Sequence, residues 1–154
     1  MYDCIIVGTD GSPTASLAVE TAAQMARAHH AKLLVASAYM PKLTLEQKTS
    51  WHELPEDVYW RVSAGSKAEA VAADAADRAR ATAGGRLDVS CRAEPGDAVD
   101  VMLDLAGQVR ADVMVVGNRP RPGLGRFRGS VARDLSRRAG CDVLIVDTVG
   151  RERR

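Results

Sequence analysis

The chain has 154 residues, a formal net charge of +1 at pH 7 and 46% hydrophobic residues. This length suits one domain with a substantial core, and the apolar share is that of an ordinary globular protein. The near-neutral charge argues against general nucleic-acid binding, which usually requires a basic domain. No run of about 18 or more apolar residues occurs, so we expect no membrane span, and the start MYDCIIVGTDGS lacks the pattern of a signal peptide.

Five short apolar runs predict strands at residues 4–9, 32–39, 86–92, 112–118 and 142–148. The runs at 4–9, 112–118 and 142–148 are nearly continuous and rich in valine and isoleucine. Strands of a parallel sheet that are covered on both faces have this composition, because neither face meets water.

Helical patterns fall between these runs, at residues 13–30, 66–83, 97–109 and 130–139. Ser12 is placed to cap the first of these helices, with Pro13 at its first position. Strands that alternate with helices predict an α/β fold with a parallel sheet and right-handed crossovers. The connection 40–65 is long and contains Trp51 and Trp60, so we expect a partly packed flap there.

Three cysteines, Cys4, Cys91 and Cys141, lie in or beside predicted strands, and none belongs to a CxxC pair. An odd number of dispersed cysteines favours small buried thiols in a reducing compartment over a disulfide framework. We therefore expect a cytoplasmic protein. No cluster of histidine and cysteine has the spacing of a zinc site.

Ligands of open α/β sheets bind beyond the carboxyl ends of the strands, so the turns at that edge are the candidate sites. Asp10 follows the first strand in GTDGS, where its carboxylate can face a ribose, a base or a metal, or can simply cap a tight turn. Ala38 ends the second strand. Its small side chain leaves room for a flat ring, or reflects ordinary strand-end packing.

The third turn follows the fourth strand, in VVGNRPRPGLGRFRGSV at 115–131. Gly117 ends the strand, and Gly129-Ser130-Val131 opens the last helix with Ser130 as its cap. Free N–H groups and a partial positive charge at a helix start attract anions. Glycines between these points allow a phosphate-binding nest of amides. The glycines and added cations of the loop are Gly123, Gly125, Arg119, Arg121, Arg126 and Arg128. The alternative is a solvated basic loop, and no Walker motif is present.

These residues resemble the universal stress protein family over nearly the whole chain. The resemblance rests on IIVGTDGS at 5–12, LLVASAY at 33–39, the stretch 115–131 and SRRAGCDVLIV at 136–146. It implies a single-domain, Rossmann-like α/β fold: an open five-stranded parallel sheet of order 3-2-1-4-5 with helices on both faces. The domain would span 1–150, followed by a frayed tail at 151–154. It also implies a homodimer through the last strand.

The resemblance further implies an adenine-nucleotide site. Asp10 would face the adenine or ribose, and Ala38 would line the adenine pocket. Val116 would lie at the adenine ring and Val131 at the start of the last helix. Together with the loop residues described above, the full set of expected nucleotide-binding residues is Gly8, Thr9, Asp10, Ala38, Val116, Gly117, Asn118, Arg119, Gly123, Gly125, Arg126, Gly129, Ser130 and Val131. The ligand would be ATP or cyclic AMP, and Mg²⁺ would accompany ATP.

One position departs from the motif G-x2-G-x9-G-[ST] of the ATP-binding members. The second glycine is replaced by Pro120, and eight residues rather than nine separate it from Gly129. Proline donates no N–H, so a phosphate contact from that amide would be lost unless Gly123 or Gly125 replaces it. A shorter loop suits one phosphate better than three, and the ASAYMP and VVGN segments resemble members that prefer cyclic AMP.

Two functions therefore stay open: a stress-response protein that binds an adenine nucleotide with little or no catalysis, and a dimeric regulatory protein that has lost this binding. An ATPase or adenylyl transferase is disfavoured, because no general base is evident near the loop and no lysine occurs from Asn118 to Arg154. A response-regulator receiver is disfavoured because no acceptor aspartate ends the third strand.

Overall fold

The computed structural model describes residues 1–40, 56–118 and 131–148, with residues 56–63 as backbone only. Strands and helices alternate along these segments. In chain order they are β1 (Cys4–Gly8), α1 (Pro13–His29), β2 (Lys32–Tyr39), α2 (Glu56–Thr82), β3 (Val89–Pro95), α3 (Ala98–Val109), β4 (Val113–Asn118), α4 (Val131–Arg138) and β5 (Asp142–Asp147).

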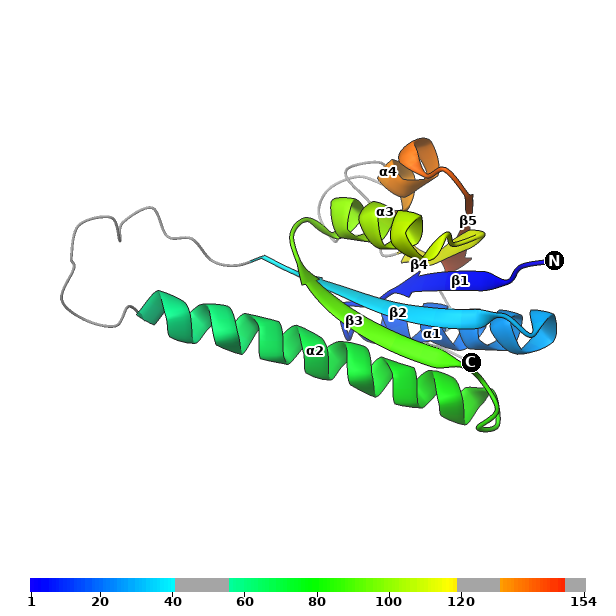
Figure 1. Cartoon of the computed structure of the whole chain (residues 1–154), viewed down its shortest axis with the longest axis horizontal. Helices are drawn as coiled ribbons and strands as arrows, with labels where there is room; N and C mark the ends of the chain where they lie inside the picture. The colour runs from blue at the N-terminus through cyan, green and yellow to red at the C-terminus, as the bar shows by residue number, and fades with distance from the viewer. Residues whose placement is uncertain (41–55, 119–130, 149–154) are drawn as a thin grey trace.

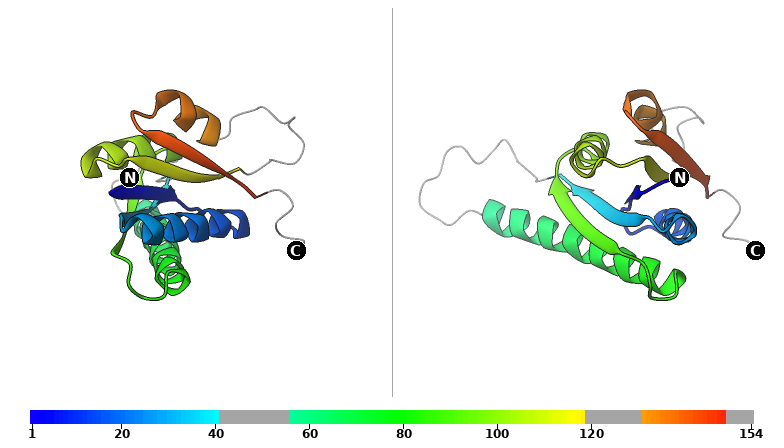
Figure 2. Two further views of the ribbon diagram at one scale, coloured as in Figure 1. Left: turned by 90° about the vertical axis from the view of Figure 1, so that its right-hand side faces the viewer. Right: turned by 45° about the vertical axis from the view of Figure 1, so that its right-hand side comes forward.

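The strands form one parallel sheet in the order β3-β2-β1-β4-β5. Helices α1 and α2 cover one face of the sheet, and α3 and α4 cover the other (Figures 1 and 2). The predicted fold class and strand order are confirmed. None of the helices in the described segments is long and apolar enough to cross a membrane.

The core has two layers, one on each face of the sheet. Ile5, Val7 and Val115 point to the layer under α1 and α2, which is filled mainly by alanines of those helices. Ile6 and Met114 point to the layer under α3 and α4. Because neighbouring residues of one strand enter opposite layers, the central strands must be apolar throughout, as their sequences predict.

Two boundaries differ from the sequence-based prediction. Helix α2 begins at Glu56 rather than at 66, so part of the expected loop is helical and extends past the strands (Figure 1). No proline interrupts the chain between Pro55 and the alanine-rich stretch, so the helix continues. Trp60 belongs to this helix, whereas Trp51 lies outside the described residues. The idea of a flap at 40–65 is therefore wrong for 56–65.

Strand β3 also lies further along the chain than the predicted run at 86–92. Its register is set by β2, from Leu33 opposite Val89 to Tyr39 opposite Pro95. As an edge strand it is half exposed, so its apolar pattern is weak and the sequence does not locate it well. Pro95 is tolerated because it ends an edge strand.

All three cysteines are free thiols, but their surroundings differ. Cys91 lies exposed on β3, so the expectation of a buried thiol is wrong there, because an edge strand has an open side. Cys4 and Cys141 are half-buried, and burial raises the pKa of each thiol, with Asp112 adding to the effect at Cys4 and Asp142 at Cys141. Thiols with raised pKa values are poorly reactive at neutral pH.

At the amino edge of the sheet, the Asp112 carboxylate ties the start of β1 to the start of β4. One of its oxygens accepts the backbone N–H groups of Asp3 at 2.7 Å and Cys4 at 2.8 Å. These two donors, that of Cys4 first, lower the pKa of Asp112 below its ordinary value. Hydrogen bonds to the charged form have this effect.

The lowered pKa predicts an acid-dependent loss of stability. The Asp112 contribution is fully present above the unfolded-state pKa of about 3.9 and is lost as the pH falls through the lower folded-state value. Asp112→Asn keeps an accepting oxygen but does not titrate. We expect the melting temperature of the parental chain to fall more steeply below about pH 4 than that of the variant. Parallel melting curves for the two proteins across this range would contradict the assignment.

Candidate functional site

The candidate site lies where β1 and β4 end side by side at the carboxyl edge of the sheet. The chain leaves β1 towards α1 on one face, and it reaches α4 on the other face after β4 (Figure 1). Such a switch point opens a crevice, and ligands of doubly wound proteins bind there. Gly8, Thr9 and Asp10 come from the first strand end, and Gly117 and Asn118 from the second.

The turn after β1 is held by its own polar groups. The backbone N–H of Thr9 donates to the carbonyl of Ala36 at 2.8 Å, and Asp10 Oδ1 accepts the N–H of Ser12 at 2.9 Å. Gly11 adopts φ +77°, a conformation that favours glycine, and its N–H donates to Thr9 Oγ1. Asp10 is exposed, and its Oδ1 stabilises this turn. The expectation that its carboxylate caps a tight turn is therefore confirmed for that oxygen.

Ser12 caps α1, as its sequence position predicts. Its Oγ accepts the N–H of Ala15 at 3.2 Å, and Pro13 is the first helical residue. The amino end of α1 lies beside the ends of β1 and β4, because α1 follows β1 and Thr14 is close to Gly117. A helix start next to this crevice adds a partial positive charge to it.

Neither Gly8 nor Gly117 has a positive φ, so backbone conformation does not require glycine there, but both lie in close packing. A Cβ on Gly117 would lie 3.3 Å from the carbonyl oxygen of Thr14. A Cβ on Gly8 would lie 3.2 Å from the sulfur of Met102 on α3. The two strand ends are thus bare backbone, with α1 packed against one and α3 against the other.

The other predicted site residues within the described segments differ in their burial. Ala38 is half-buried and packs against the core layer under α3, beside Glu94 in the register of β3. Val116 is a core residue and is 4% exposed. Asn118 is exposed at the last position of β4, and Val131 is 38% exposed at the first position of α4. Val131, Gly117 and Asn118 bracket the loop between β4 and α4.

The remaining predicted residues fall on that loop. Arg119, Gly123, Gly125, Arg126, Gly129 and Ser130 lie outside the described residues, as does Pro120. The phosphate cradle therefore stays a prediction from the sequence. The frayed tail predicted at 151–154 also lies outside the described residues.

Sequence reasoning missed Thr148, which follows β5. Thr148 is 2% exposed, and its Oγ1 donates to the carbonyl oxygen of Asn118 at 2.5 Å. Its Cγ2 would lie 3.5 Å from a Cβ on Gly117. No local pattern could have shown this contact, because it joins residues 30 apart through the β4–β5 register.

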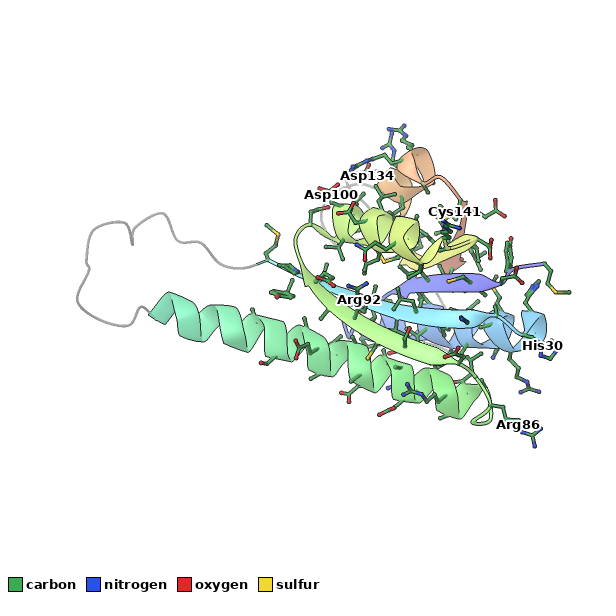
Figure 3. The ribbon with its side chains drawn as sticks, in the orientation of Figure 1. His30, Arg86, Arg92, Asp100, Asp134 and Cys141 are labelled. Atoms are coloured by element: carbon green, nitrogen blue, oxygen red, sulfur yellow. The ribbon has the colours of Figure 1, made fainter. Side chains whose placement is uncertain are left out.

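Helix α4, which follows the predicted phosphate loop, is attached in two ways. Ala132 and Leu135 are buried in the layer shared with α3. Arg138 makes an exposed ion pair with Asp100 of α3 at 2.8 Å, and Figure 3 labels Asp100 on α3 and Asp134 on α4. An exposed pair contributes little to stability, so the apolar contacts hold α4 in place.

A depression of about 490 Å³ lies at the opposite, amino edge of the sheet. Among its lining residues are Asp3, Lys32, Arg110 and Asp112. The Asp112 carboxylate is already bonded to backbone there, and the glycines of the switch point are absent from its lining. The described residues hold no group of three or more histidine, cysteine or acidic side chains suited to a metal ion.

The fold defines a doubly wound α/β protein whose switch point has glycines at both strand ends beside the capped start of α1. The model of the universal stress protein family matches residues 1–147, and the chain belongs to that family. The universal stress protein Rv1636 of Mycobacterium tuberculosis is 39% identical over 148 residues, which cover 96% of this chain and 97% of the relative.

Solved structures agree with this membership. A universal stress protein crystallised in complex with cAMP is 39% identical, with a TM-score of 0.71, over 94% of this chain and 97% of the other. Universal stress protein UspA from Lactobacillus plantarum is 19% identical with a TM-score of 0.73, over 94% of this chain and 97% of that one. At that identity the second likeness concerns the fold alone.

Proposed function

We propose that this chain is a cytoplasmic stress-response protein that binds an adenine nucleotide, cyclic AMP before ATP, with little or no catalysis. The binding domain spans residues 1–150. The ligand lies in the crevice at the ends of β1 and β4, with its base towards Asp10 and Ala38 and its phosphate on the loop between Gly117 and α4.

The observation that carries this proposal is the bare backbone at the switch point. Gly8 and Gly117 carry no side chain at the ends of β1 and β4, where Met102 of α3 and Thr14 of α1 lie close. Strand ends without side chains let a ligand approach the main chain, and the capped start of α1 favours an anion nearby.

Cyclic AMP is favoured over ATP by two further points. A solved universal stress protein structure that is 39% identical to this chain contains cAMP. Pro120 removes one amide from the loop that holds phosphates in ATP-binding members, and the loop is one residue shorter than their motif. One cyclic phosphate needs fewer amide donors than a triphosphate with Mg²⁺.

Isothermal titration calorimetry with cyclic AMP, ATP and ATP plus Mg²⁺ tests the proposal, together with mass spectrometry of small molecules that co-purify with the protein. We expect cyclic AMP to bind with a dissociation constant in the micromolar range and more tightly than ATP. If neither nucleotide binds and none co-purifies, the alternative applies, in which the chain is a dimeric regulatory protein without nucleotide binding. Tighter binding of ATP would reverse the proposed preference.

We also propose a homodimer that pairs through β5. This strand is at the edge of the sheet, so one side of its backbone has no partner strand among the described residues (Figure 2). Ile145 on this strand is 43% exposed, and Val143 and Leu144 are only half-buried. An apolar edge strand promotes association, and a twofold partner would cover it.

Ile145→Lys should convert the dimer to a monomer, because a charge would be buried at the twofold contact. Sedimentation velocity at micromolar concentration measures the change in mass. Met40→Lys is the matched control, since Met40 is 67% exposed after β2, away from this edge. A parental chain that is monomeric, or a variant that still dimerises, would rule out the β5 interface.

A further inference from the structure

We infer that Thr148 is a positioning residue for the proposed nucleotide site: it fixes the direction in which the chain leaves β4 towards the phosphate loop. This inference rests on the proposed function. The contact that carries it is the hydrogen bond from Thr148 Oγ1 to the carbonyl oxygen of Asn118.

Asn118 is the last residue of β4, and its carbonyl is the last acceptor of that strand before the loop. Its strand partner is Asp147, the last residue of β5, and Thr148 comes directly after that strand. The Thr148 hydroxyl donates a hydrogen bond to this carbonyl. A side-chain hydrogen bond therefore takes the place of a backbone hydrogen bond where the pairing of β4 with β5 ends. Threonine is therefore the residue that orients the peptide plane following Asn118.

The burial of Thr148 separates this contact from an ordinary surface bond. Thr148 and Ser37 are the buried polar residues of the described segments, and Thr148 is the more enclosed, with 2% exposed. A buried hydroxyl that loses its partner is costly, so the pairing with Asn118 is strongly maintained. No buried side-chain polar atom in the described segments lacks a partner.

The methyl group of Thr148 has a second role at the same place. It lies against Gly117, where it would be 3.5 Å from an added Cβ, on the side where Thr14 of α1 also approaches. Thr148, directly after β5, thus holds the Gly117–Asn118 segment by a hydrogen bond and by packing. A nucleotide that binds the amides beyond Gly117 would meet a strand end whose direction is already fixed, which lowers the entropic cost of binding.

Two variants of one residue test this role. Thr148→Val keeps the shape and removes the hydroxyl, whereas Thr148→Ser keeps the hydroxyl. We expect Thr148→Val to weaken cyclic AMP binding about five- to tenfold by calorimetry, and Thr148→Ser to stay within about twofold of the parental chain. Equal affinity of Thr148→Val and the parental chain, or an equal loss in both variants, would overturn the assignment.

A ligand-free measurement separates this inference from the proposed function. Hydrogen exchange of the amides of Gly117 and Asn118 should be faster in Thr148→Val than in Thr148→Ser, while that of Val113 and Met114 should be unchanged. If the parental chain binds no nucleotide, the proposed function fails, and exchange still reports whether the hydroxyl holds the strand end. Equal exchange in both variants would refute the positioning role.

Discussion

Gly117→Ala should lower the free energy of unfolding by about 1–3 kcal/mol and weaken cyclic AMP binding by about tenfold. The added methyl would lie 3.3 Å from the carbonyl oxygen of Thr14 and 3.5 Å from Thr148 Cγ2. The nearest of these atoms belongs to backbone at the start of α1 and cannot rotate away. The end of β4 must therefore shift, and the bonds that orient it shift with it. Urea unfolding and calorimetry measure the two effects.

Gly107→Ala is the matched control for this change. Gly107 lies in α3, is exposed, and has nothing within 4 Å of an added Cβ. Alanine favours a helix interior over glycine by about 0.5–1 kcal/mol, so this variant should become more stable and bind cyclic AMP unchanged. If both substitutions change stability in the same direction, close packing at Gly117 is not the cause.

Leu135→Ala should lower the free energy of unfolding by about 2–5 kcal/mol, as expected for a large side chain removed from a core. Leu135 is fully buried, and Ala132 is the other buried residue of α4. With the leucine shortened, little apolar surface would hold this eight-residue helix to the sheet. Because α4 follows the predicted phosphate loop, we also expect weaker nucleotide binding.

Ser136→Ala, one residue further along α4, is the control for Leu135→Ala. Ser136 is exposed, and its hydroxyl donates to a carbonyl one turn back, that of Arg133. Its removal should change the free energy of unfolding by no more than about 0.5 kcal/mol. Chemical denaturation followed by circular dichroism compares the two variants. A loss below about 1 kcal/mol for Leu135→Ala would show that α4 is held by contacts other than this core.

The sequence predicted the fold well because its central strands are buried on both faces. A continuous apolar run such as that of Ile5, Ile6 and Val7 has few interpretations other than a covered parallel strand. The cap at Ser12 was also predictable, since a serine followed by proline is a local signal. The boundaries of β3 and α2 were not, because an edge strand has a weak apolar pattern and the start of α2 extends past the strands of the sheet.

The sequence by itself determined the α/β class, the alternation of strands and helices, the polar turn after β1 and, through its motifs, the family. Only the tertiary structure decided which atoms meet at the switch point: the carbonyl of Thr14 against Gly117, the sulfur of Met102 against Gly8, and the hydroxyl of Thr148 on Asn118. The physical reason is that apolar periodicity and caps are local properties of a chain. Close approach between strand ends depends on register and helix packing, which join residues far apart in sequence.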